Sequence, residues 1–267
     1  MDLVIIAVIV GIIEGVTEFL PISSTGHMII VGHLLGFTGT LADVFNIFIQ
    51  LGAILSVVFL YRVKFRYFFT KEGWRKDGGF GVWHVAAGIV PVMGLAYFAH
   101  GFIKEYLFSP FTVAIGLILG ALLLIYAEKK TKNSKTELLD DLEKLTFKQA
   151  ALVGAFQILS LWPGFSRSGS TIGGGLLIGL SRRAAAEYSF IIAVPLMFVA
   201  CIYDLLKNID ALSTNDLMIL IIGFVISFIV AYFSILWFIS FLNRSSLTSF
   251  AYYRIILAVI TLWYFYF

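Results

Sequence analysis

The sequence predicts an all-α polytopic membrane protein, with about six full transmembrane helices and two re-entrant helix pairs in an inverted-topology repeat. Three observations predict this fold class. Hydrophobic residues make up 60% of the 267 residues and charged residues 13%, whereas soluble globular proteins average about 45–50% and about 25%. Several apolar segments approach or exceed about 20 residues, the length at which a helix crosses a bilayer. Two polar segments, residues 14–27 and 163–171, interrupt further apolar sequence.

The length of the chain suits one integral membrane domain, residues 1–267, without a sizeable soluble domain. Within it we expect two repeat halves, approximately residues 1–127 and 149–267. The single cysteine, Cys201, lies in an apolar segment, so the sequence has neither a disulfide framework nor a cysteine-based metal site. We interpret Cys201 as a packing residue.

The first half begins with a predicted broken helix. Residues 3–13 and 27–35 are apolar but too short to span a bilayer, and the polar segment lies between them. A membrane tolerates such a break only where it is buried in protein or lines a cavity. We therefore predict a re-entrant helix pair here, followed by full spans at residues 44–61, 83–99 and 111–127.

The second half repeats this order. Its preceding loop contains an acidic cluster, residues 137–143, for which we predict a short solvent-exposed surface helix. Residues 150–162 and 172–180 are again too short to span, and they flank the second polar segment, so we predict a second re-entrant pair. Full spans are then predicted at residues 187–206, 217–242 and 251–267.

The distribution of basic residues predicts the orientation. Fifteen of the 19 Lys and Arg residues fall on one side of this topology, which the positive-inside rule makes the cytoplasmic side. They are Arg62, Lys64, Arg66, Lys71, Arg75, Lys76, Lys129, Lys130, Lys132, Lys135, Lys144, Lys148, Arg182, Arg183 and Arg244. Because three full spans separate the re-entrant pairs, the first pair is predicted to enter from outside and the second from the cytoplasm.

The two halves share a weak sequence pattern. Residues 11–14 (GIIE) and 154–157 (GAFQ) each precede a proline and a run of hydroxyl and glycine residues. Broken helices at matching positions of an inverted repeat indicate a site near the middle of the membrane, at the interface of the repeats. We predict that the two polar segments meet there.

Glu14 and Glu18 are four residues apart, so a helix through them places both carboxylates on one face. Two adjacent acids in a low-dielectric site repel each other, so either one is protonated or a cation lies between them. Oxygen ligands suit Mg²⁺ or Ca²⁺, with phosphate oxygens of a substrate completing the shell. The alternative is a polar helix contact between neutral glutamates.

A run of small polar residues after Pro21 is suited to open a helix whose first amides bind an anion; it comprises Ser23, Ser24, Thr25 and Gly26. Helix capping is the simpler use of the same residues. Ser24 stands three residues before His27, a spacing that brings a hydroxyl near an imidazole and predicts a nucleophile–base pair. The alternative for His27 is a hydrogen-bonding core residue.

Arg167 is the strongest single indication of a ligand. A guanidinium flanked by Ser166 and Ser168 at membrane depth needs an anionic counterpart, and its geometry matches phosphate bidentately. A purely structural ion pair with Glu14 or Glu18 is the alternative. A Walker A pattern is absent, and nothing in the sequence indicates nucleotide or nucleic-acid binding.

At these segments the sequence closely resembles the undecaprenyl-diphosphatase family, the bacitracin-resistance phosphatases of bacterial inner membranes. The first family motif, Glu/Gln-x-x-x-Glu followed by Phe-Leu-Pro-x-Ser-Ser-Thr-Gly-His, matches residues 14–27, and the second, Pro-Gly-x-Ser-Arg-Ser-x-x-Thr, matches residues 163–171. The likeness extends to residues 50–54 and to residues 179–183 and 186–190, and so covers most of the chain.

The resemblance implies metal-dependent hydrolysis of undecaprenyl diphosphate to the monophosphate, which recycles the lipid carrier of peptidoglycan synthesis and confers bacitracin resistance. It places the site in the inner membrane, open to the periplasmic side. Glu14 and Glu18 would hold the Mg²⁺ or Ca²⁺ or handle a proton, Arg167 would clamp the diphosphate, and Ser24 and His27 would act at phosphorus. The phosphate-binding residues would be Ser23, Thr25, Gly26, Ser166, Ser168 and Thr171.

Several alternatives stay open at this point. A serine nucleophile activated by Glu18 or His27 is the first choice, a phosphohistidine the second and a metal-bound water the third. A transporter or flippase of a lipid phosphate or another anion is the competing function, because broken helices in inverted repeats are also a transport architecture. The expected partners are undecaprenyl diphosphate and membrane lipid, with a homodimer as the candidate assembly and no nucleic acid.

Overall fold

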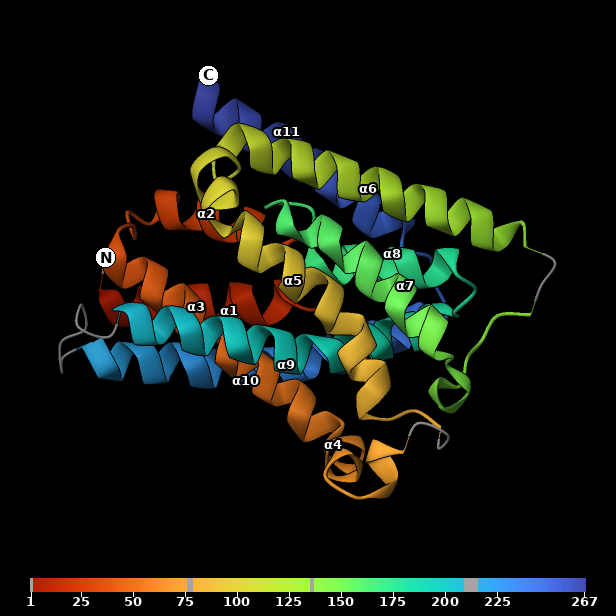
Figure 1. The fold of residues 1–267 in the computed structure, drawn as a ribbon. Coiled ribbons are helices and arrows are strands. Elements are labelled where there is room, and N and C mark those ends of the chain that lie inside the picture. Colours follow the sequence, from red (N-terminus) through yellow and green to blue (C-terminus); the bar gives the residue numbers. More distant parts are fainter. Residues whose placement is uncertain (1, 76–78, 135–136, 209–215) are drawn as a thin grey trace.

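The computed structural model of the protein describes residues 2–75, 79–134, 137–208 and 216–267, and these residues form a helical bundle (Figure 1). Its α-helices are α1 (Leu3–Thr17), α2 (Ser24–Leu34), α3 (Thr40–Leu60), α4 (Arg62–Phe68), α5 (Val82–Tyr106), α6 (Pro110–Lys132), α7 (Phe147–Gln157), α8 (Arg167–Leu177), α9 (Arg182–Asn208), α10 (Asp216–Leu242) and α11 (Thr248–Tyr266). Three short 3₁₀ turns are η1 (Glu72–Trp74), η2 (Leu142–Lys144) and η3 (Ile158–Leu161).

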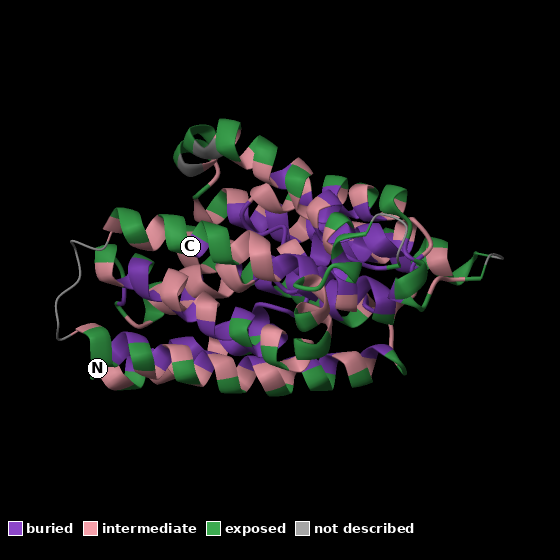
Figure 2. Ribbon diagram, turned by 60° about the horizontal axis from the view of Figure 1, so that its bottom comes forward, coloured by how far each residue is buried: buried purple, intermediate pink, exposed green. Residues whose placement is uncertain are grey.

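Six of these helices are long and apolar enough to cross a membrane: α3, α5, α6, α9, α10 and α11. They coincide with the six predicted spans and confirm an all-α polytopic membrane fold. The boundaries differ by several residues: α5 extends to Tyr106 and not only to residue 99, and α9 begins at Arg182 and not at residue 187. Large apolar side chains such as Phe98, Phe233 and Val259 are exposed on the outer faces, and Figure 2 shows the buried residues gathered in the interior. The outer faces are therefore suited to lipid.

Two pairs of shorter helices, α1–α2 and α7–α8, are each interrupted at the predicted polar segment. Each pair returns to the end of the molecule at which it begins. Phe37, just after α2, packs with Ile6 of α1 in one apolar cluster, and Gly179, just after α8, accepts a backbone hydrogen bond from Leu139, ahead of α7. The interruptions lie where the sequence predicts them, whereas the re-entrant course of each pair in a bilayer, and its entry from opposite sides, stays a prediction.

The packing interleaves the two halves of the chain. The short helix α1 lies along α10, and α7 lies against α5, so each half supplies the long helix on which the other half's broken pair rests. The helices α3 and α9 pack together, as do α6 and α11. This arrangement brings the two breaks together in the centre of the bundle (Figure 1).

The loops that carry most of the predicted cytoplasmic basic residues meet at one end of the molecule. Lys64 Nζ lies 3.4 Å from Glu143 Oε1. Arg182 donates to both carboxylate oxygens of Glu128 at 2.7 and 2.6 Å, and Glu128 also accepts the backbone N–H of Leu247 at 2.8 Å. These contacts are consistent with the prediction that the loops lie on the same side of the membrane. Lys76 and Lys135 lie outside the described residues.

The predicted surface helix at the acidic cluster is wrong. Only the 3₁₀ turn η2 forms there. Leu139 makes a β-bridge with Leu180, in which its N–H donates to Gly179 and its carbonyl accepts from Ser181. The bridge uses the backbone groups that a helix would need, so pairing with the chain after α8 prevails over the local helical pattern.

Candidate active site

The first break lies between α1 and α2. Glu18 is the C-cap of α1, with Glu14 one turn before it. Ser23 is the N-cap of α2, and its side chain accepts the N–H of Gly26 at 3.4 Å. Ser23 has φ of 71°, which is uncommon for a residue with a side chain. The chain reverses at Ser23 so that Ser24, the first residue of α2, points back toward α1.

The second break has the same local structure. Ser166 is the N-cap of α8, has φ of 73° and accepts the N–H of Gly169 at 3.1 Å. Ser23 and Ser166 are the only non-glycine residues with positive φ in the part of the chain that the structure describes. Just before Ser166, Gly164 adopts φ of 89° and packs against Val113 of α6, where a side chain would collide with the backbone. Arg167 is the first residue of α8.

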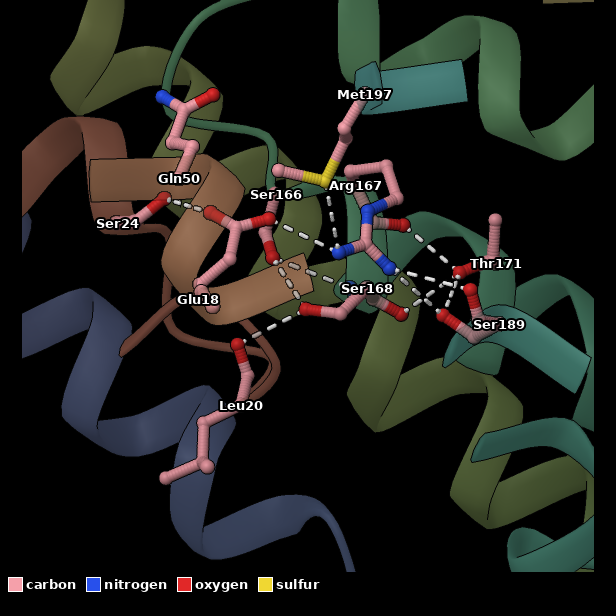
Figure 3. A network of polar contacts seen from close by, with 12 residues as sticks. Glu18, Leu20, Ser24, Gln50, Ser166, Arg167, Ser168, Thr171, Ser189 and Met197 are labelled. Atoms are coloured by element: carbon pink, nitrogen blue, oxygen red, sulfur yellow. Dashed lines mark hydrogen bonds and ion pairs between the residues drawn. The ribbon is translucent and has the colours of Figure 1, made fainter. Parts of the chain in front are cut away.

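The two breaks meet through Glu18, as predicted (Figure 3). Arg167 Nη2 lies 2.9 Å from Glu18 Oε1, and both side chains are almost fully buried. Ser24 donates its hydroxyl to Glu18 Oε2 at 2.6 Å. The carboxylate therefore joins the first residue of α2 to the first residue of α8, so the two short helices begin at one point.

Further contacts fix Arg167. Its Nη1 donates to the carbonyl and hydroxyl oxygens of Ser189 at 3.2 and 3.4 Å, and its Nη2 lies 3.5 Å from the sulfur of Met197. The guanidinium also stands over the ring of Phe19, 5.4 Å from its centroid. Its Nε atom is buried without a hydrogen-bond partner. Arg167 is therefore held in one orientation and keeps one unused donor.

A second buried arginine, Arg254 of α11, holds the backbone of the breaks in place. Its Nη2 donates to the carbonyls of Phe165 and Gly164 at 2.7 and 3.0 Å, and its Nη1 lies 3.5 Å from the carbonyl oxygen of Pro21. Further bonds reach carbonyls of α6. Among the described residues no carboxylate pairs with it. Backbone dipoles thus compensate this cation, and both breaks depend on it.

A cavity of about 160 Å³ lies where the breaks meet. At about 30 Å³ for each water molecule, it has room for one phosphate group with some water, but not for a prenyl chain. Its lining residues are Glu18, Ser23, Ser24, Thr25, Gln50, Ser160, Trp162, Pro163, Gly164, Ser166, Arg167 and Met197. The N-termini of α2 and α8 both reach this cavity, and helix N-termini favour anions because their first N–H groups have no partner within the helix.

Four residues predicted to bind or transform the substrate do not line the cavity, and neither does the predicted metal ligand Glu14. Gly26 is buried beside Leu117. Ser168 donates to the carbonyl of Leu20 at 2.9 Å, which ties α8 to the first break. Thr171 is fully buried and bonds Ser189 at 2.6 Å. His27 is the fourth. Ser23, Ser24, Thr25, Ser166 and Arg167 do line it.

The structure does not join the Ser24 hydroxyl to the His27 ring, and of the two bases expected for Ser24 it places Glu18 beside the hydroxyl. Ser24 donates to Glu18. The ring of His27 instead bonds the carbonyl of Ser23 at 2.8 Å and the hydroxyl of Tyr253 at 2.7 Å. Ser23 has a positive φ, and this backbone conformation directs the side chain of Ser24 toward the carboxylate of Glu18 at the end of α1.

The surroundings of Glu14 bear on whether the site suits a divalent cation. It is 1% exposed, and its Oε1 atom has no hydrogen-bond partner. It lies one helical turn before Glu18, so the two carboxyl groups share one face of α1. Among the described residues no three His, Cys, Asp or Glu side chains form a metal-binding cluster. Two carboxylates with one unused buried oxygen fit Mg²⁺ or Ca²⁺ only as a partial ligand set that substrate oxygens would complete.

Three residues that contact the site, Ser189, Tyr253 and the carbonyl-bound Arg254, are not predicted from the sequence. Ser189 lies within residues 186–190, which belong to the family likeness, so a signal for it was present in the sequence. Tyr253 and Arg254 lie in an apolar span, where a polar side chain by itself indicates a buried partner but does not identify it.

Comparison with known proteins places these features in a family. The family model of the bacitracin resistance protein BacA matches residues 7–260. The undecaprenyl-diphosphatase 1 of Bacillus anthracis is 48% identical over 261 residues, which cover 97% of this chain and 97% of that protein. The undecaprenyl-diphosphatase of Maridesulfovibrio salexigens is 48% identical over 259 residues, with the same coverage of both chains.

The undecaprenyl-diphosphatase of Thermoanaerobacter pseudethanolicus is also 48% identical, over 263 residues that cover 97% of this chain and 96% of that protein. These matches confirm the resemblance that residues 14–27 and 163–171 predict, and they extend it along nearly the whole chain. The protein is a member of the BacA family of bacitracin resistance proteins.

Proposed function

We propose that the protein hydrolyses undecaprenyl diphosphate to undecaprenyl phosphate and inorganic phosphate, at the cavity between the two breaks. The observation that carries this proposal is the shared contact of Glu18 with Ser24 and Arg167. It combines a hydroxyl nucleophile, a base and an anion-binding cation within one small cavity. The names of the relatives favour this activity over transport of a lipid phosphate, which needs no nucleophile.

Binding of the diphosphate follows from charge. Phosphoryl transfer depends mainly on positioning and charge neutralisation. Arg167 supplies a fixed guanidinium with an unused Nε donor, and the first turns of α2 and α8 supply backbone N–H groups. The cavity accepts the terminal phosphate, and the prenyl chain stays along the apolar outer faces of the helices. Trp162 and Met197 supply apolar surface at the cavity.

The hydroxyl of Ser24 is suited to attack the terminal phosphorus. Its hydrogen bond to Glu18 Oε2 lets the carboxylate take the proton as the Oγ–P bond forms. The bond from that phosphorus to the bridging oxygen breaks, Glu18 passes its proton to the departing oxygen, and undecaprenyl phosphate leaves. Water then attacks the phosphoserine phosphorus, and Glu18 takes a proton from it. As the Oγ–P bond breaks, Glu18 returns this proton to Ser24 Oγ, so that inorganic phosphate and free Ser24 result. Arg167 stabilises the negative charge in both steps.

A divalent cation belongs to the proposal. Glu14 and Glu18 would hold it, together with phosphate oxygens, and when bound it supplies charge neutralisation at the diphosphate. The unused oxygen of Glu14 supports this role. Without such a cation, Glu14 and Glu18 share the single positive charge of Arg167, which leaves the site one negative charge in excess if both are ionised.

We further propose that the protein lies in the bacterial inner membrane with the cavity open to the periplasmic side. The ion pairs between Lys64 and Glu143 and between Arg182 and Glu128 tie the predicted cytoplasmic loops together. The first break, which supplies Ser24 and Glu18, belongs to the helix pair that begins and ends at the opposite end of the molecule. Hydrolysis there returns the lipid carrier for peptidoglycan synthesis and accounts for bacitracin resistance.

The test is phosphate release from undecaprenyl diphosphate by purified protein in detergent, with Mg²⁺, Ca²⁺ or EDTA. We expect cation-dependent release that Glu18→Ala and Arg167→Ala each abolish. Ser56→Ala, a buried serine of α3 outside the cavity, is the control and should keep activity. No release from folded wild-type protein under any of these conditions would overturn the proposal and favour transport.

A further inference from the structure

Both ring nitrogens of His27 are engaged by the protein itself. Nδ1 lies 2.8 Å from the carbonyl oxygen of Ser23, and Nε2 lies 2.7 Å from the hydroxyl of Tyr253. The rings of His27 and Tyr253 are nearly parallel, at 7°, with centroids 5.7 Å apart. Ser24 and Glu18 bond each other and not the imidazole. His27 therefore has no direct contact with the groups that attack or bind phosphate.

The partners determine the tautomer of His27. A carbonyl oxygen only accepts hydrogen bonds, so Nδ1 must carry the proton that is shared with Ser23. In a neutral imidazole Nε2 is then the acceptor, and the Tyr253 hydroxyl donates to it. An Nε2 atom that accepts from Tyr253 cannot at the same time take a proton from Ser24 or attack phosphorus.

His27 affects the site through the hydrogen bond between its ring and the carbonyl of Ser23. Ser23 has φ of 71°, a conformation that persists only where surrounding contacts hold it. Its carbonyl accepts from both the ring Nδ1 and the backbone N–H of His27. This conformation directs the hydroxyl of Ser24 at Glu18 Oε2. Loss of the ring contact would release Ser23 and misalign Ser24.

Tyr253 connects this arrangement to α11. The next residue of that helix, Arg254, bonds the carbonyls of Gly164 and Phe165 in the second break. Two consecutive residues of α11 thus act on different breaks. Tyr253 acts on the first break through His27, and Arg254 forms its shortest hydrogen bonds with the second break. Their neighbour Tyr252 is exposed and lines neither break.

We propose that His27 is a positioning residue and not the base or nucleophile, and that Tyr253 is a second positioning residue acting through it. Together they hold Ser23 in its left-handed conformation and thereby aim Ser24 at Glu18. The inference rests on the proposed phosphatase activity for its kinetic test, but not for its spectroscopic one.

The kinetic test compares His27→Asn with His27→Gln. The side-chain nitrogen of asparagine takes the position of Nδ1 and can still donate to Ser23, whereas that of glutamine takes the position of Nε2. We expect His27→Asn to keep kcat within about tenfold of wild type, and His27→Gln to lose about 100-fold or more, with KM unchanged within about twofold in both. Tyr253→Phe should lower kcat about three- to tenfold, consistent with one hydrogen bond, and Tyr252→Phe, the matched control, should not change it.

The double variant His27→Asn/Tyr253→Phe should match His27→Asn within about twofold, because the asparagine no longer reaches the tyrosine. Equal losses of about 10³-fold or more in the asparagine and glutamine variants, or an acid-labile phosphate trapped on His27, would overturn the positioning role.

The spectroscopic test is independent of turnover. Solid-state ¹⁵N spectra of the protein in lipid, with the His27 signals identified by their absence in His27→Asn, should show Nδ1 protonated and Nε2 as acceptor. A ring protonated at Nε2 would overturn the inference. If the tautomer is as expected and wild-type protein releases no phosphate, the proposed function fails while the assigned geometry stands.

Discussion

The two breaks of the bundle share one backbone and differ in their chemistry. Ser23 and Ser166 each cap a short helix with positive φ, and each accepts the N–H of the glycine three residues on. The next residue points at Glu18 in both cases, but it is Ser24 in the first break and Arg167 in the second. The same turn thus presents a hydroxyl group, the proposed nucleophile, from one half of the chain and a cation from the other.

The preceding helices differ in the same way. Glu14 and Glu18 lie nine and five residues before the capping serine of the first break, Ser23. The residues at the same distances before Ser166, the capping serine of the second break, are Gln157 of α7 and Leu161 of η3. Gln157 donates to the carbonyl of Gly88 at 3.0 Å, so its role is packing against α5. A repeated backbone can therefore build one asymmetric site, with the acids and the proposed nucleophile on one side and the cation on the other.

The largest effect is expected at Ser24, the proposed nucleophile. Ser24→Ala should reduce phosphate release at least about 10³-fold, because no other hydroxyl in the described part of the chain bonds Glu18. Initial rates with undecaprenyl diphosphate measure this loss. Near-normal turnover in Ser24→Ala would show that water attacks directly and that the first break only binds.

The next effect tests the cation of the second break. Arg167→Lys keeps the charge but loses the planar fork, which reaches Glu18 through Nη2 and Ser189 through Nη1. We expect kcat/KM to fall about 10- to 100-fold, in steady-state assays at saturating Mg²⁺. Full activity in the lysine variant would mean that charge alone is sufficient and that the fixed orientation has no role.

A third change makes the second half resemble the first. Gln157→Glu puts a carboxyl group at a fully buried position and removes the donor to Gly88. We expect no gain in turnover and a loss of about 1–3 kcal/mol in stability, measured by thermal unfolding in detergent. Increased activity or tighter cation binding would contradict the division of roles, because the second half would then also accept an acid site.

The smallest effects are expected at the shared turns. Glycine tolerates positive φ, so Ser23→Gly and Ser166→Gly should each change stability by less than about 1 kcal/mol, the relief of strain offsetting the lost cap. The alanine variants keep the strain and lose the cap, and each should cost about 1–2 kcal/mol. Unequal results at the two positions in thermal unfolding would show that the turns are not equivalent.

The sequence is sufficient to predict the six long helices and the meeting of the breaks. Long apolar segments identify α3, α5, α6, α9, α10 and α11, and the cost of an isolated intramembrane charge requires Arg167 to find an acid. These signals are strong because the apolar interior of a bilayer allows few arrangements of backbone polar groups and charged side chains.

Other contacts could not be predicted because they depend on backbone conformation. Positive φ at Ser23 decides that Ser24 meets Glu18 and not His27. Arg254 binds carbonyl groups, which every residue has, so no side-chain pattern identifies its partners. The β-bridge of Leu139 replaces a locally plausible helix for a similar reason.

The central claim is that the first break cleaves the diphosphate and the second binds it. It is tested most directly by binding of an undecaprenyl diphosphate analogue, in which a methylene group replaces the bridging oxygen, to Ser24→Ala and Arg167→Ala, alongside phosphate release by the same preparations. We predict that Ser24→Ala binds the analogue within about threefold of wild type without turnover, whereas Arg167→Ala binds it at least about 30-fold more weakly. Equal loss of binding in both variants, or binding unaffected by removal of Arg167, would contradict the account.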